Sequence, residues 1–392
     1  MGSIFDEEIE RKNTSCLKWD CCKQRFKRAD IFPMWVADMD FKSPAQVIDA
    51  LIRRAEHGVF GYTVPSESLS KALLGWLERR HQWEIDNSWL VHSPGVVTSV
   101  NISILAFTEV GDKILLQTPI YYPFYSSIQE NQRELVTNPL QNNNGFYEID
   151  FADLEEKLGN GVKMMVFCSP HNPIGRVWRQ NELEEVARLC RQYNVILISD
   201  EIHSDLVYKG YKHIPIAPLS EEVLRNSVTL VSPTKTFNLA GLCQSTAIIP
   251  NAGLRQGFIN TISRTGAGML NVFGLEAAEV AYSCCEDWLE ELMIYLQKNL
   301  EITEEYFKKY IPQIKVIRPE ATYLAWLDCK QLPLEMEKLK EFFTFRAGVG
   351  LNDGITFGKE GLGFQRLNFA CPRTLLREGL ERIRKAVSEL YA

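Results

Sequence analysis

The stretch SVTLVSPTKTFN, residues 227–238, decides how the rest of the chain is interpreted. Its first half is an apolar, β-branched run that breaks at Ser232 and Pro233, a pattern typical of a buried strand leading into a loop. The loop then presents Lys235, and lysine is seldom placed inside a protein for packing alone. Lys235 is therefore the first candidate for a functional residue.

Two further predicted strands also end at polar residues. The run KMMVFC (163–168) leads to Asn172, and VILI (195–198) leads to Asp200 and His203. Residues 181–193 between them have helical spacing, so the three segments form a strand–helix–strand unit with parallel strands. Because the carboxyl ends of parallel strands meet at one edge of a sheet, we expect Asn172, Asp200 and Lys235 to share one crevice.

These three residue types suit a pyridine cofactor that carries an aldehyde. A lysine amine binds such an aldehyde covalently, a carboxylate partners the ring nitrogen, and a polar side chain contacts the ring oxygen. From the residues alone, the sequence predicts chemistry of this kind on an amino acid.

Composition indicates an ordinary globular protein. The chain has 392 residues, 45% of them hydrophobic and 24% charged, and its net charge of −7 includes no basic block, so we expect no nucleic-acid partner. The ten cysteines form no pattern with zinc spacing, so we expect no metal and a reduced protein. A charged start without an apolar leader, and no apolar run of about 20 residues, predict a cytoplasmic protein with no membrane contact.

Several motifs together resemble a known family. They are SPTK around Lys235, Asn172, and the segments MWVADMDF (34–41), DEIH (200–203) and TYLAWLD (322–328). The set resembles the aspartate-aminotransferase-like superfamily of pyridoxal 5′-phosphate (PLP) enzymes, fold type I. Within it, the chain is similar over nearly its whole length to the MalY/PatB branch, the cystathionine β-lyase-type C–S lyases.

The resemblance implies an α/β fold with two domains. We expect a large PLP-binding domain at 46–285 with a mostly parallel, seven-stranded sheet flanked by helices, and a smaller α/β domain at 286–392. Residues 1–45 would pack with the small domain, and a long helical stretch from Ala277 to about Tyr310 would lead into it. A homodimer with a shared active site is also implied.

The resemblance also assigns roles around the cofactor ring. Lys235 would bind PLP covalently and, once displaced by an amino acid, take its Cα proton, while Asp200 would pair with the pyridine nitrogen. Asn172 and His203 would contact the ring 3′-oxygen, although His203 could equally be a structural loop histidine. Tyr121 would stack on the ring, with a packed aromatic corner as the alternative.

The cofactor phosphate has its own predicted site. A turn of small residues that opens a helix near Gly95 presents free N–H groups and the positive end of the helix dipole. By resemblance, Gly95, Val96 and Val97 would supply backbone donors and Ser232 a hydroxyl. Tyr62 would reach the phosphate from the other subunit, with a structural turn tyrosine as the alternative.

Substrate binding is assigned to the chain's last thirty residues and to segment 34–41. Arg366 matches the family arginine that binds the substrate α-carboxylate, a pairing that is bidentate. The backbone of Val36 and Ala37 would border that carboxylate. Arg373 is a weaker, structural candidate.

The resemblance favours carbon–sulfur β-elimination of L-cystathionine or a related cysteine S-conjugate. Aminotransferases of the superfamily often place an arginine eight residues after the lysine, whereas this chain has Cys243 there, as in the MalY/PatB branch. An aminotransferase with the same residues is the alternative. A third interpretation, a PLP protein that mainly binds a regulatory partner, is opposed by the presence of Lys235, Asp200 and Arg366.

Overall fold

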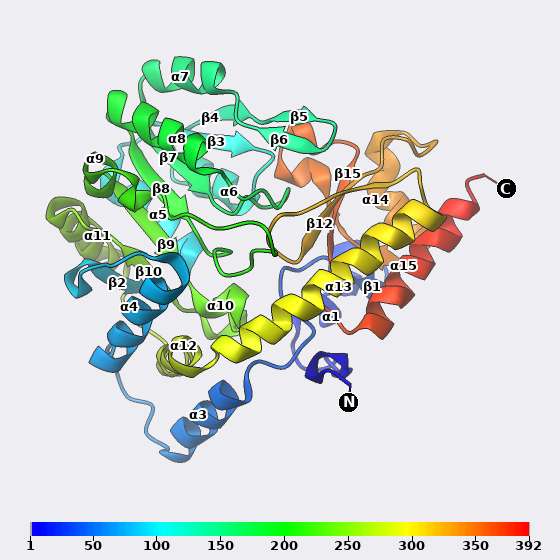
Figure 1. The fold of residues 1–392 in the computed structure, drawn as a ribbon, viewed down its shortest axis with the longest axis horizontal. Coiled ribbons are helices and arrows are strands. Elements are labelled where there is room, and N and C mark those ends of the chain that lie inside the picture. Colours follow the sequence, from blue (N-terminus) through cyan, green and yellow to red (C-terminus); the bar gives the residue numbers. More distant parts are fainter. Residues whose placement is uncertain (1, 392) are drawn as a thin grey trace.

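A seven-stranded sheet forms the centre of the larger part of the molecule (Figure 1). The computed structural model describes residues 2–391. The strand order is β2-β10-β9-β8-β7-β3-β4; β9, β8, β7, β3 and β4 are parallel, and β10 is antiparallel to both of its neighbours. The predicted mostly parallel sheet is therefore confirmed. The strands are β2 Leu90–Ser93, β3 Lys113–Thr118, β4 Glu134–Pro139, β7 Val162–Cys168, β8 Ile196–Asp200, β9 Ser227–Val231 and β10 Ser245–Ile248.

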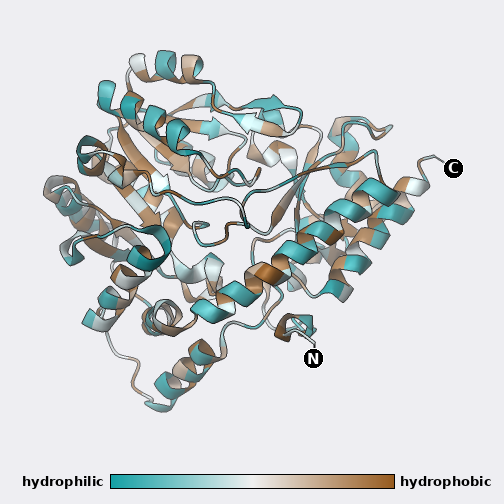
Figure 2. Ribbon diagram, in the orientation of Figure 1, coloured by the Kyte–Doolittle hydropathy of each residue, from teal (hydrophilic) through white to brown (hydrophobic). Residues whose placement is uncertain are grey.

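Alternating side chains bury both faces of this sheet. Met165 and Phe167 of β7 belong to one apolar cluster with α7 and α8, whereas Met164 and Val166 belong to another with α5, α6 and α11. A parallel sheet needs such two-sided cover, which explains why the central strand β7 is apolar on both faces. Figure 2 shows hydrophobic strands between helices with hydrophilic outer sides. These helices are α5 Val96–Phe107, α6 Pro123–Glu130, α7 Phe151–Gly159, α8 Gln180–Gln192, α9 Glu221–Arg225 and α11 Ala252–Thr265.

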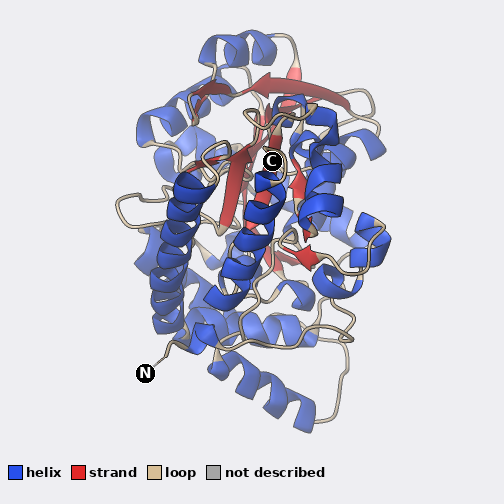
Figure 3. Cartoon of the chain, turned by 90° about the vertical axis from the view of Figure 1, so that its right-hand side faces the viewer, coloured by secondary structure: helices blue, strands red, loops and turns tan. Residues whose placement is uncertain are grey.

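A second, antiparallel sheet lies in the C-terminal part of the chain, with the order β11-β12-β15-β14. Two long helices pack on one face of it, and Figure 3 looks onto this part of the molecule. Trp326 and Phe364 stack at 5.1 Å on the other face and join the apolar cluster of α7 and α8. The elements are β11 Lys315–Ile317, β12 Leu324–Asp328, β14 Asn352–Asp353, β15 Phe364–Asn368, α13 Glu286–Tyr310, α14 Leu339–Glu341 and α15 Arg373–Ser388.

The N-terminal segment connects these two parts. Strand β1 pairs in parallel with β13, so this segment attaches to the C-terminal part of the chain. Asn238, three residues after Lys235, donates to the carbonyl oxygens of Met39 and Phe41 and so ties residues 39–41 to the lysine turn. Other elements are α1 Leu17–Asp20, α2 Cys22–Phe26, β1 Phe32–Pro33, α3 Ala45–Glu56, α4 Glu67–His81, the hairpin β5 Gln141–Asn143 with β6 Phe146–Glu148, and β13 Val349–Gly350.

Two local predictions were wrong. The predicted loop after β9 is the short helix α10 Pro233–Thr236, which contains Lys235 and is capped by the Ser232 hydroxyl. The helical stretch expected from Ala277 to Tyr310 is two helices, α12 Val272–Cys284 and α13, because the backbone leaves the helical region at Cys285. Across residues 2–391, no helix has the length and apolar character needed to span a membrane.

Candidate active site

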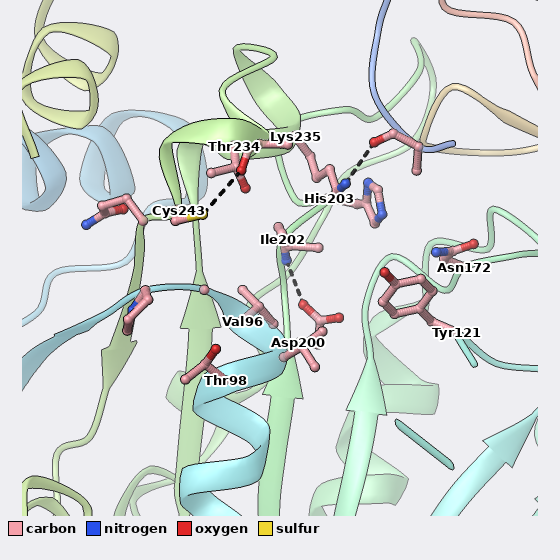
Figure 4. A pocket seen from close by; sticks show the side chains of 16 residues that line it. Val96, Thr98, Tyr121, Asn172, Asp200, Ile202, His203, Thr234, Lys235 and Cys243 are labelled. Atoms are coloured by element: carbon pink, nitrogen blue, oxygen red, sulfur yellow. Dashed lines mark hydrogen bonds between the residues drawn. The ribbon is translucent and has the colours of Figure 1, made fainter. Parts of the chain in front are cut away.

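The segments that follow strands β3, β7, β8 and β9 surround one cavity of about 210 Å³ at the carboxyl edge of the large sheet (Figure 4). The N-terminus of α5 and residue 37 of the N-terminal segment complete its wall. The structure therefore brings together residues that are far apart in the sequence. The predicted site residues that line the cavity are Ala37, Gly95, Val96, Val97, Tyr121, Asn172, Asp200, His203 and Lys235.

Lys235 projects from α10 toward the N-terminal segment. Its Nζ donates a hydrogen bond of 2.7 Å to the carbonyl oxygen of Ala37 (Figure 4). Burial, opposed by the nearby Asp38 and Asp200 and aided by Arg366, lowers the pKa of the Lys235 amine to about 8. An amine with this pKa has an appreciable neutral fraction at physiological pH, as a nucleophile or base requires.

Asp200 ends β8 and is 4% exposed. Oδ1 accepts a 3.2 Å hydrogen bond from the Ile202 amide, and Oδ2 lies 3.9 Å from the Cys168 thiol. These two contacts do not offset the loss of hydration on burial, so the pKa of the Asp200 carboxyl is raised to about 7. This carboxylate would therefore be stabilised by a cationic or donating group in the cavity.

His203 and Asn172 supply polar atoms beside Lys235. The His203 Nδ1 is buried without a hydrogen-bond partner, and burial, aided by Lys235 and Arg366, lowers the pKa of the ring to about 3. The imidazole is therefore neutral. The Asn172 carbonyl oxygen accepts from Arg366, which leaves its amide nitrogen available to a ligand.

Arg366 lies in β15, buried directly behind Asn172. Nη1 donates to Asn172 at 2.9 Å, and Nη2 donates to Asn352 at 2.8 Å and to the Trp35 carbonyl at 3.2 Å. Nε is buried without a partner. A fixed guanidinium with a free N–H is a natural receptor for a carboxylate.

The opposite end of the cavity has the character of an anion site. Gly95 precedes the first turn of α5, and a Cβ built on it would have no neighbour within 4 Å, so the space before the helix N-terminus is open. Apart from Lys235, the residues that line the cavity in the described part of the chain include no lysine or arginine. Thr98, Thr234 and Gln244 also line the cavity and were not predicted, although Thr234 lies within the SPTK motif.

Four predicted residues do not line the cavity. Ser232 uses its hydroxyl to cap α10 and to donate to the Gln244 carbonyl at 2.7 Å, so Thr234 faces the cavity in its place. The Val36 carbonyl accepts from Asn368 at 2.6 Å. Arg366 stands one residue behind the wall, and Tyr62 is 94% exposed. The roles proposed for these residues remain predictions.

PLP fits this donor set. Its ring nitrogen complements the under-compensated Asp200, its ring oxygen complements the unpartnered His203 nitrogen and the Asn172 amide, and its phosphate complements the open N-terminus of α5. Lys235 is the amine that its aldehyde requires. The residues present therefore match each polar group of this cofactor.

Comparison with known proteins gives a consistent result. Residues 30–383 match the family model described as aminotransferase class I and II. The chain is 42% identical to the cystathionine β-lyase PatB of Bacillus subtilis, over 98% of this chain and 100% of that protein, and 34% identical to the protein MalY of Escherichia coli, over 98% of each. Cystalysin from Treponema denticola, whose structure contains a pyridoxal 5′-phosphate cofactor, superposes with a TM-score of 0.96 at 36% identity over 100% of both chains.

Proposed function

Because this chain belongs to the class I and II aminotransferase family and, within it, to the MalY/PatB branch, we propose that it is a PLP-dependent carbon–sulfur β-lyase. It cleaves L-cystathionine or a related cysteine S-conjugate to a thiol, pyruvate and ammonia. One observation carries the proposal: Lys235, Asp200 and Asn172 meet in one cavity of a chain that matches a cystathionine β-lyase over 98% of its length.

Bound PLP supplies an aldehyde that captures the substrate amine and a ring that accepts electrons from Cα. Asp200 holds the ring nitrogen through its buried carboxylate, and His203 and Asn172 hold the ring oxygen. Arg366 orients the substrate carboxylate so that the Cα hydrogen is directed at Lys235. These side chains position the reacting atoms before any proton moves.

Lys235 then acts as the base. Its Nζ takes the Cα proton, and the thiolate leaves from Cβ with the electrons of the C–S bond. The remaining 2-aminoacrylate is hydrolysed by water to pyruvate and ammonia, so the reaction consumes one water and needs no external oxidant or keto acid. The carbonyl of Ala37, 2.7 Å from Nζ, receives the protonated amine.

An aminotransferase is the second candidate, because the matching family model has that description. The same residues would serve it, with the proton returned to the cofactor in place of loss of a thiolate. A strict requirement for a keto acid would distinguish it.

We further propose a cytoplasmic homodimer with the domain division expected from the sequence. Tyr62 is exposed together with Val59, Phe60 and Val64, an apolar segment that a second copy would cover and from which Tyr62 would reach the partner's cofactor. All ten cysteines are free, which suits a reducing compartment.

The test uses purified protein, L-cystathionine and no keto acid. Pyruvate is followed with a lactate-dehydrogenase couple and thiol with a thiol reagent, with Lys235→Ala as the control. Equal amounts of pyruvate and thiol, abolished in the control, are the expected result. A cofactor that converts to its amine form and recovers only with a keto acid would establish the aminotransferase instead.

A further inference from the structure

The carbonyl oxygen of Ala37 accepts two hydrogen bonds inside the candidate active site. The Lys235 Nζ donates to it at 2.7 Å, and the Tyr323 hydroxyl donates to the same oxygen at 2.9 Å. Tyr323 is 1% exposed and lies just before β12. The proposed mechanism gives this tyrosine no role, although its hydroxyl and the base share an acceptor.

The carbonyl cannot easily turn away from either donor. The amide nitrogen of Asn368 donates to the Val36 and Asp38 carbonyls, at 2.6 Å each, and so fixes the backbone on both sides of Ala37. Tyr323 is fixed as well, because its own carbonyl accepts from the Phe369 amide at 3.1 Å and the next residue, Leu324, pairs with Asn368 of β15. Both donors must therefore share one oxygen.

Sharing this oxygen has an electrostatic consequence. The positive end of the Tyr323 O–H dipole points at the oxygen that would otherwise bind the protonated amine alone. It repels the positive charge on Nζ and occupies part of the acceptor's capacity, and both effects favour the neutral amine.

We propose that Tyr323 is a positioning residue for Lys235: through the shared Ala37 carbonyl it weakens the hold on the protonated amine and keeps the neutral base available. The use of that base in elimination depends on the proposed function. The effect on the lysine itself does not, since it requires neither cofactor nor substrate.

The other groups near Nζ are compatible with this role. Asp38 and Asp200 favour the protonated amine, whereas Arg366 disfavours it. Asp38 is already paired with Arg11 at 2.6 Å, and His203 and Tyr121 face the site as neutral groups. Tyr323→Phe removes one dipole without changing any charge and retains the ring that lies edge-on to His203, 6.3 Å away.

The experiment measures the basicity of Lys235 directly. Full-length protein freed of cofactor is labelled with acetic anhydride from pH 6 to 10, and the Lys235 peptide is quantified by mass spectrometry. The wild-type midpoint should lie near 8. Tyr323→Phe should raise it by about half a unit or more, which is roughly a threefold loss of neutral amine at pH 7.

Tyr208→Phe is the matched control. It removes a buried tyrosine-to-carbonyl hydrogen bond one residue away from Tyr323, but not the one to Ala37, so its midpoint should equal that of the wild type. Circular dichroism checks the fold of each variant. Replacing Tyr323 by 3-fluorotyrosine keeps the shape and strengthens the donor, so it should move the midpoint down.

An unchanged or lower midpoint in Tyr323→Phe, or an equal rise in Tyr208→Phe, would overturn the proposal. If Tyr323→Phe does not fold, the 3-fluorotyrosine protein tests the proposal. A midpoint that is unchanged or raised in that protein would refute the role of Tyr323. In the holoenzyme, the pKa of the acid limb of the kcat profile should rise together with the labelling midpoint, because Lys235 is a free amine only in the enzyme–substrate complex. Absence of lyase activity with a shifted midpoint would refute the proposed function and leave this inference standing.

Discussion

The two ends of the cavity are built differently. At the lysine end, Lys235, Asp200 and His203 are ionisable groups whose pKa values burial has shifted. At the α5 end, neutral donors and a helix N-terminus face the cavity. The difference reflects the chemistry, because charge and protons move only at the lysine end. The phosphate takes no part in bond breaking, and fixed dipoles can hold its negative charge.

The largest effect is expected from Lys235→Ala. Loss of both the covalent anchor and the base should lower pyruvate formation by roughly 10⁴-fold or more. The bound cofactor should also lose the absorbance of its lysine linkage. Lys209→Ala, at an exposed lysine, is the control. A Lys235→Ala protein that kept more than a hundredth of the wild-type activity would contradict the assignment.

The next effect is on the stability of cofactor-free protein. The pKa of Asp200 is raised to about 7 from an unfolded value of 3.8, so the folded state resists ionisation. The Asp200 carboxyl does not destabilise the folded state below pH 3.8. Its destabilising contribution to the free energy of unfolding grows as the pH rises and is complete above pH 7. Asp200→Asn should therefore become progressively more stable than wild type between pH 4 and 8, by a few kcal/mol at pH 8.

Thermal unfolding of both cofactor-free proteins across this pH range measures the effect. The exposed Asp49→Asn variant should follow the wild type at every pH. With PLP bound, the advantage of Asp200→Asn should shrink or reverse, because the ring nitrogen then partners the wild-type carboxylate. A stability difference that does not change with pH would contradict the raised pKa.

A smaller loss is expected from Arg366→Lys. Lysine cannot reproduce the fork that contacts Asn172 and Asn352 while leaving Nε free, so kcat/KM should fall by roughly 10- to 100-fold. Steady-state kinetics should show much of this loss in KM. Arg373→Lys, whose guanidinium lies over the Tyr295 ring, should change kcat/KM less than threefold.

Variants at the α5 end should change cofactor retention and leave the pH profile of kcat unchanged. Thr98→Val removes one hydroxyl that lines the cavity from the first turn of α5, and a single neutral hydrogen bond is worth roughly 0.5–1.5 kcal/mol. We therefore expect a two- to tenfold rise in the dissociation constant of PLP, measured by fluorescence quenching. A shift in the acid limb of the kcat profile of this variant would contradict the view that only the lysine end controls proton transfer.

Tyr62→Phe gives the smallest expected change, a severalfold weaker retention of PLP. The effect depends on a second subunit, because Tyr62 is 94% exposed on its own chain. Dialysis against cofactor-free buffer measures it, with the exposed Tyr211→Phe as the control. Unchanged retention would remove Tyr62 from the site.

The central strands and most of the cavity residues could be predicted, because the pattern of apolar and polar residues along the sequence indicates them. The apolar runs before Asn172, Asp200 and Lys235 predict buried parallel strands, and polar residues at strand ends converge at one sheet edge in any such fold. Tyr323 could not be found in this way. Its motif gives no sign that its hydroxyl meets the Ala37 carbonyl, 286 residues earlier in the chain.

The sequence by itself determined the buried strands before Asn172, Asp200 and Lys235, the edge at which these residues gather and the type of cofactor they suit, because strand periodicity and side-chain chemistry are local properties. Only the tertiary structure decided which atoms face the cavity. Capping of α10 turns Ser232 inward and leaves Thr234 in the wall. Packing of β15 brings Arg366 to Asn172 across 194 residues. The directions of these side chains depend on contacts between distant segments, and therefore on how the two sheets and the N-terminal segment pack together.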